Sequence, residues 1–232
     1  MATSKQYYNV GVIVFDGADI LDFAGPMEIL SHISHNRSSD NPDRMFKIQT
    51  IARKPTIRAA GSLAVNVDLL LDEATGVISS FDILVVPGGT SSVILALLDA
   101  GAPELDVIRK FSGLPQRSST QQRILFSVCT GAFLLGATGI LAGVTVTTHH
   151  TGLDTLRDIC SRANVAAAPT IVEFRRYIDS GLLEGGAVRL ITAGGISSGL
   201  DASLYLVSQL TSPDMAANIA RVMEYDWKEL EQ

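Results

Sequence analysis

Four short, continuously apolar runs most constrain the fold, because each is followed by a glycine-containing turn and then a helical pattern. They lie at 8–15, 81–89, 123–128 and 188–195. Each is rich in Val, Ile and Leu and lacks polar alternation, which is typical of strands buried on both faces of a parallel sheet. The fourfold repeat of strand, turn and helix predicts an α/β fold with a doubly wound, mostly parallel sheet.

The remaining segments fit around this core. The alternating run at 45–52 predicts another strand, and 56–70 predicts a hairpin that turns near Gly61-Ser62. A short strand is expected at 144–148, and a hairpin over 173–193 leads into the last core strand. Helices are expected at 25–33, 91–100 with Ser91 or Ser92 as N-cap, 130–141, 152–163 and 197–210. No internal repeat or linker is visible, so we expect one domain over 1–232.

Composition excludes several classes of function. The chain has 232 residues, a net charge of −6 and scattered Lys and Arg, so no basic stripe is available for nucleic acid. Its two cysteines have no C-x-x-C spacing, which argues against disulfides and zinc ribbons and suits a reducing compartment. The N-terminus lacks a signal-peptide pattern, and no apolar run reaches the roughly 20 residues of a membrane span. We therefore expect a cytoplasmic protein without membrane or nucleic-acid partners.

Cys129 stands where an apolar run ends at Val128 and a helical pattern begins at Thr130 or Gly131. Such a turn would place the thiol at the carboxyl edge of the sheet, where sites of open α/β sheets form. Backbone N–H groups and the helix dipole there are expected to lower the pKa of the thiol. Gly131 would permit a tight turn and leave room for a substrate. The alternative is a buried structural cysteine, but the junction favours a nucleophile.

Three acids, Asp16, Asp19 and Asp22, follow the first apolar run. Asp22 has apolar neighbours, so we expect it to be partly desolvated, with a raised pKa that keeps it available as a proton donor. Its alternative role is a helix cap, because Gly25-Pro26 would begin a helix just after it. Asp16 and Asp19 have the character of turn and cap residues.

Three further candidates follow other strands. The bare N–H groups of Gly88 and Gly89 could bind a developing anion, although Pro-Gly-Gly also suits a simple turn. His149 and His150 could act in acid–base chemistry, ligate a metal or lie on the surface; no cluster with metal-ligand spacing is visible, so no metal is expected. Asp201, early in a predicted helix, either closes the site or interacts with the helix dipole.

Taken in order, these motifs closely resemble the ThiJ/PfpI superfamily, which includes the Parkinson-disease deglycase and the glutamine-amidotransferase-like domains. The resemblance covers roughly residues 8–225 and rests on "FDGADILDFAGPMEIL", "DILVVPGGT", "SVCTGAFLLGATGILAG", "TTHH" and "ITAGGISSGLDASL". It implies a flavodoxin-like three-layer sandwich, usually a homodimer. It also implies that Cys129 is the nucleophile and Asp22 its acidic partner, that Thr130 and Asp201 help to order the pocket, and that the Gly88–Gly89 amides form an anion-binding turn.

Within the superfamily, the chain most resembles the isocyanide (isonitrile) hydratases. Asp22 stands where the deglycase branch has glutamate, and Thr130 follows the cysteine where other branches have histidine. Two departures concern the pocket and its surroundings: the family commonly has Thr-Thr-His-Trp where this chain ends the motif with His149-His150, and 182–188 is additional sequence. AraC-type regulators share the domain but carry a DNA-binding region after it, and the chain length disfavours that interpretation.

The resemblance implies a mechanism that needs no cofactor or metal. The Cys129 thiolate attacks a small isocyanide to give a thioimidate, Asp22 begins protonated and shuttles protons, and water releases an N-substituted formamide. One alternative is a glyoxalase or deglycase acting on methylglyoxal-type carbonyls, with His149 as proton shuttle. The other is a non-enzymatic redox or stress sensor in which Cys129 is oxidised.

Overall fold

A seven-stranded sheet forms the centre of the protein. The computed structural model describes residues 5–36, 38, 40–117, 121–164, 167–185 and 187–229. The strand order is β10-β11-β7-β6-β1-β2-β5. All neighbouring pairs are parallel except β10 with β11. The strands are β1 (Tyr8–Ile13), β2 (Phe46–Ala52), β5 (Leu69–Leu70), β6 (Ile83–Val86), β7 (Arg123–Val128), β10 (Tyr177–Leu182) and β11 (Val188–Ala193).

This architecture confirms the predicted α/β class and the four apolar core strands. Every residue of β6 and β7 is buried, as expected for strands covered on both faces. The predicted hairpin at 56–70 is present as the antiparallel pair β3 (Thr56–Ala59) and β4 (Leu63–Asn66). The later predicted hairpin is also present as β10 and β11, although its residue 186 lies outside the described residues.

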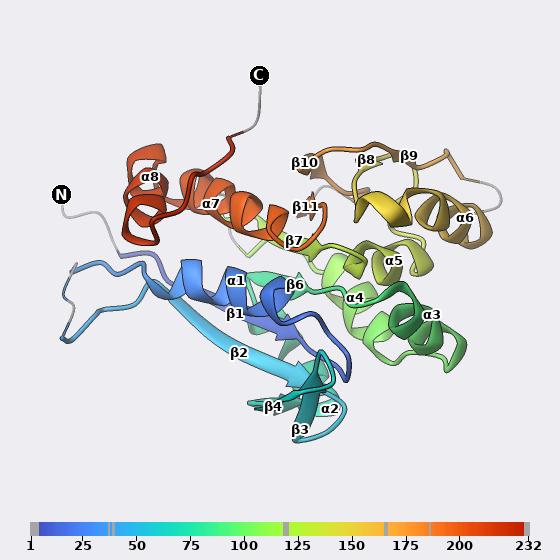
Figure 1. The fold of residues 1–232 in the computed structure, drawn as a ribbon, viewed down its shortest axis with the longest axis horizontal. Helices are drawn as coiled ribbons and strands as arrows, with labels where there is room; N and C mark the ends of the chain where they lie inside the picture. Colours follow the sequence, from blue (N-terminus) through green and yellow to red (C-terminus); the bar gives the residue numbers. More distant parts are fainter. Residues whose placement is uncertain are drawn as a thin grey trace.

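Helices flank the sheet in two groups (Figure 1). The first and last parts of the chain meet in one group, where α1 packs on α7 and α7 packs on α8. Helix α5 packs on α3, α4 and α6 in the other group. The helices are α1 (Ile20–Ser31), α2 (Leu71–Val77), α3 (Ser91–Asp99), α4 (Glu104–Ser112), α5 (Gly131–Ala137), α6 (Leu153–Ala163), α7 (Ser198–Leu210) and α8 (Pro213–Val222). Among the described residues, no helix is both long and apolar enough to cross a membrane.

Helix α1 begins five residues earlier than the sequence predicted, since it starts at Ile20 and contains Pro26. A proline inside a helix removes one backbone hydrogen bond, here the one that the Asp22 carbonyl would accept. Helix α1 packs closely on α7. A Cβ on Gly25 would lie 2.8 Å from the side chain of Leu200, so glycine allows the two helices to approach. The early start places Asp22 in the first turn of the helix.

Three other expectations about local structure were confirmed in kind but differ from the structure in their bounds or caps. The helix expected over 130–141 ends at Ala137, because Gly139 adopts a positive φ of 84° that leaves the helical region. The N-cap of α3 is Thr90, not Ser91 or Ser92. The strand expected at 144–148 is only β8 (Thr145–Val146), which pairs with β9 (Ile171–Val172) outside the main sheet.

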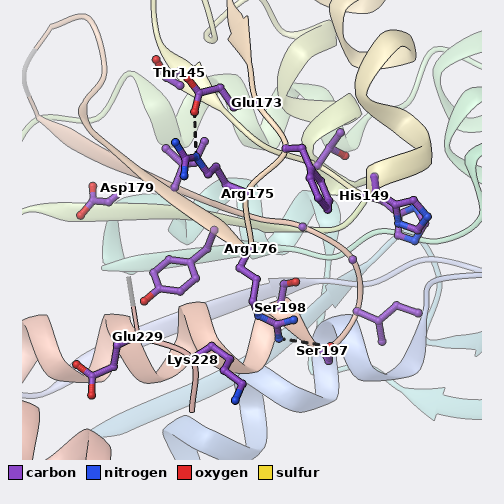
Figure 2. Close-up of a pocket in the computed structure, with 18 residues that line it drawn as sticks. Thr145, His149, Glu173, Arg175, Arg176, Asp179, Ser197, Ser198, Lys228 and Glu229 are labelled. Atoms are coloured by element: carbon purple, nitrogen blue, oxygen red, sulfur yellow. Dashed lines mark hydrogen bonds and ion pairs between the residues drawn. The ribbon is translucent and has the colours of Figure 1, made fainter. Parts of the chain in front are cut away.

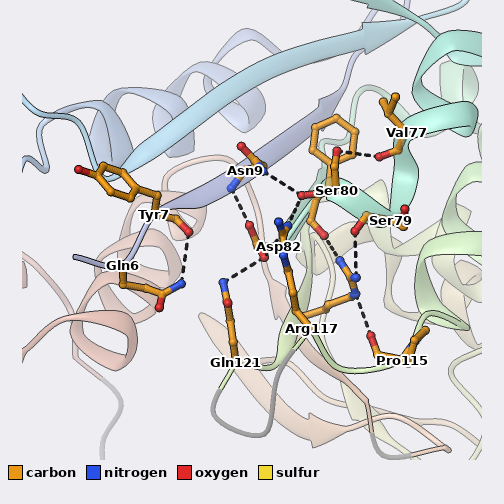
Figure 3. Close-up of polar contacts among 12 residues, drawn as sticks. Gln6, Tyr7, Asn9, Val77, Ser79, Ser80, Asp82, Pro115, Arg117 and Gln121 are labelled. Carbon is orange, nitrogen blue, oxygen red and sulfur yellow. Dashed lines mark hydrogen bonds and ion pairs between the residues drawn. The ribbon is translucent and has the colours of Figure 1, made fainter. Parts of the chain in front are cut away.

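Two buried charged residues, Asp82 and Arg123, connect neighbouring segments at the amino-terminal edge of the sheet, where β6 and β7 begin. Asp82 accepts hydrogen bonds from Arg117, Gln121 and the backbone N–H of Asn9 (Figure 3). Arg123, only 4% exposed, donates to the carbonyl of Pro115 at 2.9 Å, to that of Ser79 at 3.0 Å, and to that of Phe81. Burial lowers the pKa of its guanidinium. These contacts tie the segment before β7 to the segment before β6, far from the carboxyl edge.

We expect Arg123→Met to lower the free energy of unfolding by about 3 kcal/mol, because the buried carbonyl of Phe81 and the part-buried hydrogen bonds to the carbonyls of Ser79 and Pro115 lose their donor. Urea unfolding at pH 7 would measure this loss. Arg109→Met is the matched control, since its exposed ion pair with Asp106 on α4 is expected to contribute less than about 0.5 kcal/mol. Equal effects of the two substitutions would contradict a special role for Arg123.

Candidate active site

The loops that follow β1, β6, β7 and β11 meet at the carboxyl edge of the sheet. The strands that follow β1 in the chain extend the sheet first on one side of β1, with β2 and β5, and then on the other, with β6, β7 and β11. The order of the strands therefore reverses at β1. Crevices form at such switch points in open α/β sheets. The loops bring together the acids before and within α1, the Gly88–Gly89 turn, Cys129 and the segment 194–196.

Cys129 lies on the predicted turn between β7, which ends at Val128, and α5, which begins at Gly131. Its φ of 56° is unusual for a residue with a side chain. Its N–H donates to the carbonyls of Gly194 at 2.9 Å and Ala193 at 3.1 Å, which fixes the turn against the loop after β11. A Cβ on Gly131 would lie 2.3 Å from the carbonyl oxygen of Val86. Gly131 therefore makes room for backbone, not for substrate as the sequence suggested.

The environment of the Cys129 sulfur corrects the expectation of a lowered pKa. The residue is 3% exposed. Burial raises the pKa of the thiol to about 12, and the negative charge of Asp22 adds to this effect. The backbone N–H groups of Thr130 and Ile196 act in the opposite direction, since they hydrogen-bond to the sulfur and lower its pKa. The dipoles that the sequence predicted are present, but desolvation outweighs them, so the resting form is the thiol.

Asp22 is fully buried beside Cys129. Its Oδ2 accepts a hydrogen bond of 3.0 Å from the N–H of Gly88, while Oδ1 is buried without a partner of hydrogen-bonding geometry among the described residues. Burial raises the pKa of this carboxyl to about 7, with a further increase from the charge of Asp19; Gly88 and Cys129 lower it. The predicted desolvation of Asp22 is confirmed. A carboxyl with this pKa can exchange a proton near neutral pH.

The Gly88–Gly89 turn has a different task from the predicted one. The Gly88 N–H already donates to Asp22, and the Gly89 N–H donates to Oγ1 of Thr130 at 3.0 Å. The same hydroxyl donates back to the Gly89 carbonyl at 2.7 Å. Both amides are thus occupied by side chains and are not open to an anion. A Cβ on Gly88 would lie 2.6 Å from both the backbone nitrogen and Oγ1 of Thr130, which explains the need for glycine.

A cleft of about 1060 Å³ opens beside the cysteine. It is lined by His149, Gly194–Ser198 and residues on and before β10, including Arg175 and Arg176. Figure 2 shows His149 across this cleft from Asp179. Cys129 is not among the described lining residues, but segment 194–196 lines the cleft and also contacts Cys129 through the bonds given above. This segment therefore connects the lining of the cleft to Cys129.

The predicted pocket residues divide into two groups. His149 lines the cleft, and its ring packs against His150 with centroids 4.3 Å apart. Burial, followed by the neighbouring His150, lowers the pKa of His149. Asp201 lies outside the cleft: it is fully buried on α7, pairs with Arg176, and accepts the N–H of Lys228 at 2.8 Å. Asp201 therefore positions an arginine of the cleft and the C-terminal segment.

Sequence reasoning missed two residues near the sulfur. Ile196 has a positive φ of 35°, which is rare for a β-branched residue. In this conformation its N–H hydrogen-bonds to the Cys129 sulfur. Asp19 brings a second carboxylate to the pair: ligand atoms of Asp19, Asp22 and Cys129 lie within 4.8 Å of one another. A metal-ligand cluster was not expected from sequence spacing. Such a trio could hold a divalent cation, but the raised pKa of Cys129 opposes the deprotonation that ligation requires.

We expect alkylation of Cys129 by iodoacetamide to be slow at pH 7 and to accelerate about tenfold per pH unit up to pH 9.5, because only the thiolate reacts. The pKa of about 12 places the inflection above this range. Mass spectrometry of Cys160→Ala protein would follow Cys129 alone. A plateau in rate below pH 8 would contradict the thiol resting form.

Comparisons with known proteins agree with this architecture. Residues 8–197 match the sequence profile of the DJ-1/PfpI family. The chain is 27% identical over 216 residues to an isonitrile hydratase of Pseudomonas putida, covering 93% of this chain and 78% of that protein. A crystal structure of a ThiJ/PfpI family protein from Pseudomonas syringae superposes with a TM-score of 0.72 at 21% identity, covering 100% of this chain and 81% of the other. Oxidised DJ-1 from Toxoplasma gondii gives 0.66 at 15%, covering 95% and 100%.

Proposed function

Since the chain belongs to the DJ-1/PfpI family, we propose that it is an isocyanide hydratase in which Cys129 is the nucleophile and Asp22 carries the proton. The observation that carries the proposal is the pairing of a buried thiol with a buried carboxyl whose Oδ1 has no described partner. The similarity to the isonitrile hydratase of Pseudomonas putida supports the choice of substrate.

The first half-reaction suits this pair. In this step the terminal carbon of the isocyanide forms two new bonds, one to the sulfur and one to a proton. With pKa values of about 12 for Cys129 and about 7 for Asp22, the pair above pH 7 is a thiol beside a carboxylate. Asp22 takes the thiol proton as the S–C bond forms and passes it to the same carbon, giving the thioimidate R–N=CH–S. Asp22 is then a base first, not the initially protonated acid that the resemblance implied.

In the second half-reaction, water adds to the thioimidate carbon and its nitrogen gains a proton. The tetrahedral species R–NH–CH(OH)–S collapses to the N-substituted formamide, the C–S bond breaks, and sulfur regains a proton. The N–H groups of Thr130 and Ile196, which already hydrogen-bond to the sulfur, stabilise negative charge as the thiolate leaves. A preorganised donor of this kind contributes about 3 kcal/mol in other enzymes.

The raised pKa of Cys129 also bears on the alternative of a redox sensor. Sensor cysteines are exposed thiolates at neutral pH, whereas Cys129 is 3% exposed and the pKa of its thiol is about 12. A buried nucleophile activated by a neighbouring base fits these properties better. The glyoxalase alternative would use His149, which lines the cleft, as proton shuttle.

A substrate screen tests the proposal. Purified protein would be incubated with small alkyl and aryl isocyanides and, separately, with methylglyoxal, and products followed by mass spectrometry. We expect N-substituted formamides from the isocyanides and no lactate from methylglyoxal. Lactate formation without formamide would replace the proposal with the glyoxalase alternative.

A further inference from the structure

The carboxylate of Asp19 lies in an unusual place for a helix N-cap. N-cap aspartates normally accept a hydrogen bond from an N–H in the first turn, but the side chain of Asp19 makes no capping bond to α1. Its backbone is fixed instead, because its N–H donates to the Gly88 carbonyl at 3.0 Å and its carbonyl accepts the N–H of Asp22 at 3.2 Å. A carboxylate oxygen lies within 4.8 Å of Asp22 and of the Cys129 sulfur.

Its neighbour Asp16 shows that this orientation is not general to the loop. The Asp16 carboxylate is 49% exposed, pairs with Lys54 and accepts the N–H of Arg58 at 2.9 Å. Asp16 therefore fastens the loop to the β3–β4 hairpin, while Asp19 is turned toward the sulfur. Two acids three residues apart thus have different surroundings and, we argue, different tasks.

A second, independent feature indicates that the cluster is built for a reactant. Asp22 is 0% exposed, and its Oδ1 has no partner of hydrogen-bonding geometry among the described residues, although the neighbouring Cys129 thiol lowers the pKa of the carboxyl. Leaving such an oxygen unpaired is unfavourable unless a proton or ligand satisfies it during the reaction. Asp19, by contrast, is only half-buried. A proton can therefore pass between Asp19 and solvent more readily than between buried Asp22 and solvent.

We propose that Asp19 is a second catalytic acid–base residue, which activates the water that hydrolyses the thioimidate. This inference rests on the proposed hydratase function. In the first half-reaction Asp22 returns its proton to the isocyanide carbon, so it is ionised when the thioimidate forms, and its Oδ2 remains bound to Gly88. Asp19 is a second carboxylate near the sulfur, and because it is only half-buried it is available to a water molecule that enters the site. The charged and titratable groups facing Asp19 are Asp22 on α1, Cys129 on the β7–α5 turn, and His149.

The proton balance closes with Asp19 in this role. Its carboxylate takes one proton from water as the oxygen bonds to the thioimidate carbon, and the C=N electron pair moves to nitrogen. Asp19 then gives that proton to the nitrogen. On collapse, the hydroxyl proton passes to Asp22 and on to the departing sulfur as the C–S bond breaks. Both carboxylates and the thiol return to their starting forms, and the net reaction adds one water.

The test compares Asp19→Asn with Asp22→Asn and the control Asp16→Asn. Each variant is mixed with a small alkyl isocyanide, quenched over milliseconds to minutes, and measured by intact-protein mass spectrometry. For Asp19→Asn we expect thioimidate formation within about threefold of wild type but hydrolysis slowed about 100-fold, the size of effect typical of a general base. The adduct, heavier by the mass of the isocyanide, then becomes the main species. Asp22→Asn forms little adduct, and Asp16→Asn behaves as wild type.

The outcomes separate this inference from the function on which it rests. If wild type forms N-substituted formamide but Asp19→Asn neither accumulates adduct nor slows turnover, the role of Asp19 is overturned while the hydratase stands. If wild type forms neither adduct nor formamide, the proposed function fails and this inference fails with it. Thermal unfolding of all variants checks that they are folded, and Asn is itself a favourable N-cap residue.

Discussion

Cys129→Ala should abolish hydration of any isocyanide that the wild-type protein accepts, with kcat/KM falling by about 10⁴-fold or more. The reason is that no other described nucleophile shares the position of this sulfur, which receives the N–H groups of Thr130 and Ile196 and lies beside Asp22. Product formation measured by chromatography would give the rate. Alanine at a φ of 56° is strained no more than cysteine, so the fold should persist.

The second cysteine provides the matched control. Cys160 is also 3% exposed, but it lies on α6 with its sulfur close to Gly136 of α5. We expect Cys160→Ala to retain wild-type turnover and to lose only packing energy. If Cys129→Ala kept more than a hundredth of wild-type activity, the covalent mechanism would be wrong. If both variants lost activity equally, the loss would have to be attributed to the fold.

The sequence predicted the backbone of the site better than its electrostatics. The apolar runs predicted the central strands because burial on both faces leaves a clear pattern, and the Val128–Gly131 junction located Cys129. The pKa of Cys129 was predicted in the wrong direction, since the helix terminus is visible in the sequence but the depth of burial and the contact with Asp22 are not. Both depend on packing between loops distant in the chain.

Tertiary contacts also explain the errors of detail. Gly88 and Gly89 present bare amides in the sequence, but only the fold shows that Asp22 and Thr130 occupy them. Asp201 lies in the expected helix, but its role is set by an ion pair with Arg176. Arg176 comes from a segment that carries no motif. Asp19 was predicted as a cap, and it is at the N-cap position; its turn toward the sulfur depends on the Gly88 carbonyl that holds its backbone.

Asp22→Asn should separate stability from activity. We expect kcat/KM to fall by about 10²- to 10⁴-fold, because an amide cannot accept the thiol proton. Asparagine can keep the bond from the Gly88 N–H through its carbonyl oxygen, so the local geometry should survive. Formamide production and intact mass after isocyanide treatment would both be reduced.

The same substitution should stabilise the folded protein by an amount that grows as pH rises from about 4 to 7. The pKa of Asp22 is raised from 3.8 to about 7 in the folded state, so folding favours the protonated carboxyl. Its contribution to stability is present below pH 4 and is lost as pH rises toward and through 7. At pH 8 the buried carboxylate is expected to cost up to about 4 kcal/mol that the neutral amide does not. Urea unfolding should therefore show Asp22→Asn more stable than wild type by up to about 4 kcal/mol at pH 8 and by only about 1 kcal/mol at pH 4.5, with Asp16→Asn lacking this pattern. A difference from wild type that does not change with pH would contradict the raised pKa, and with it the proton exchange on which the mechanism depends.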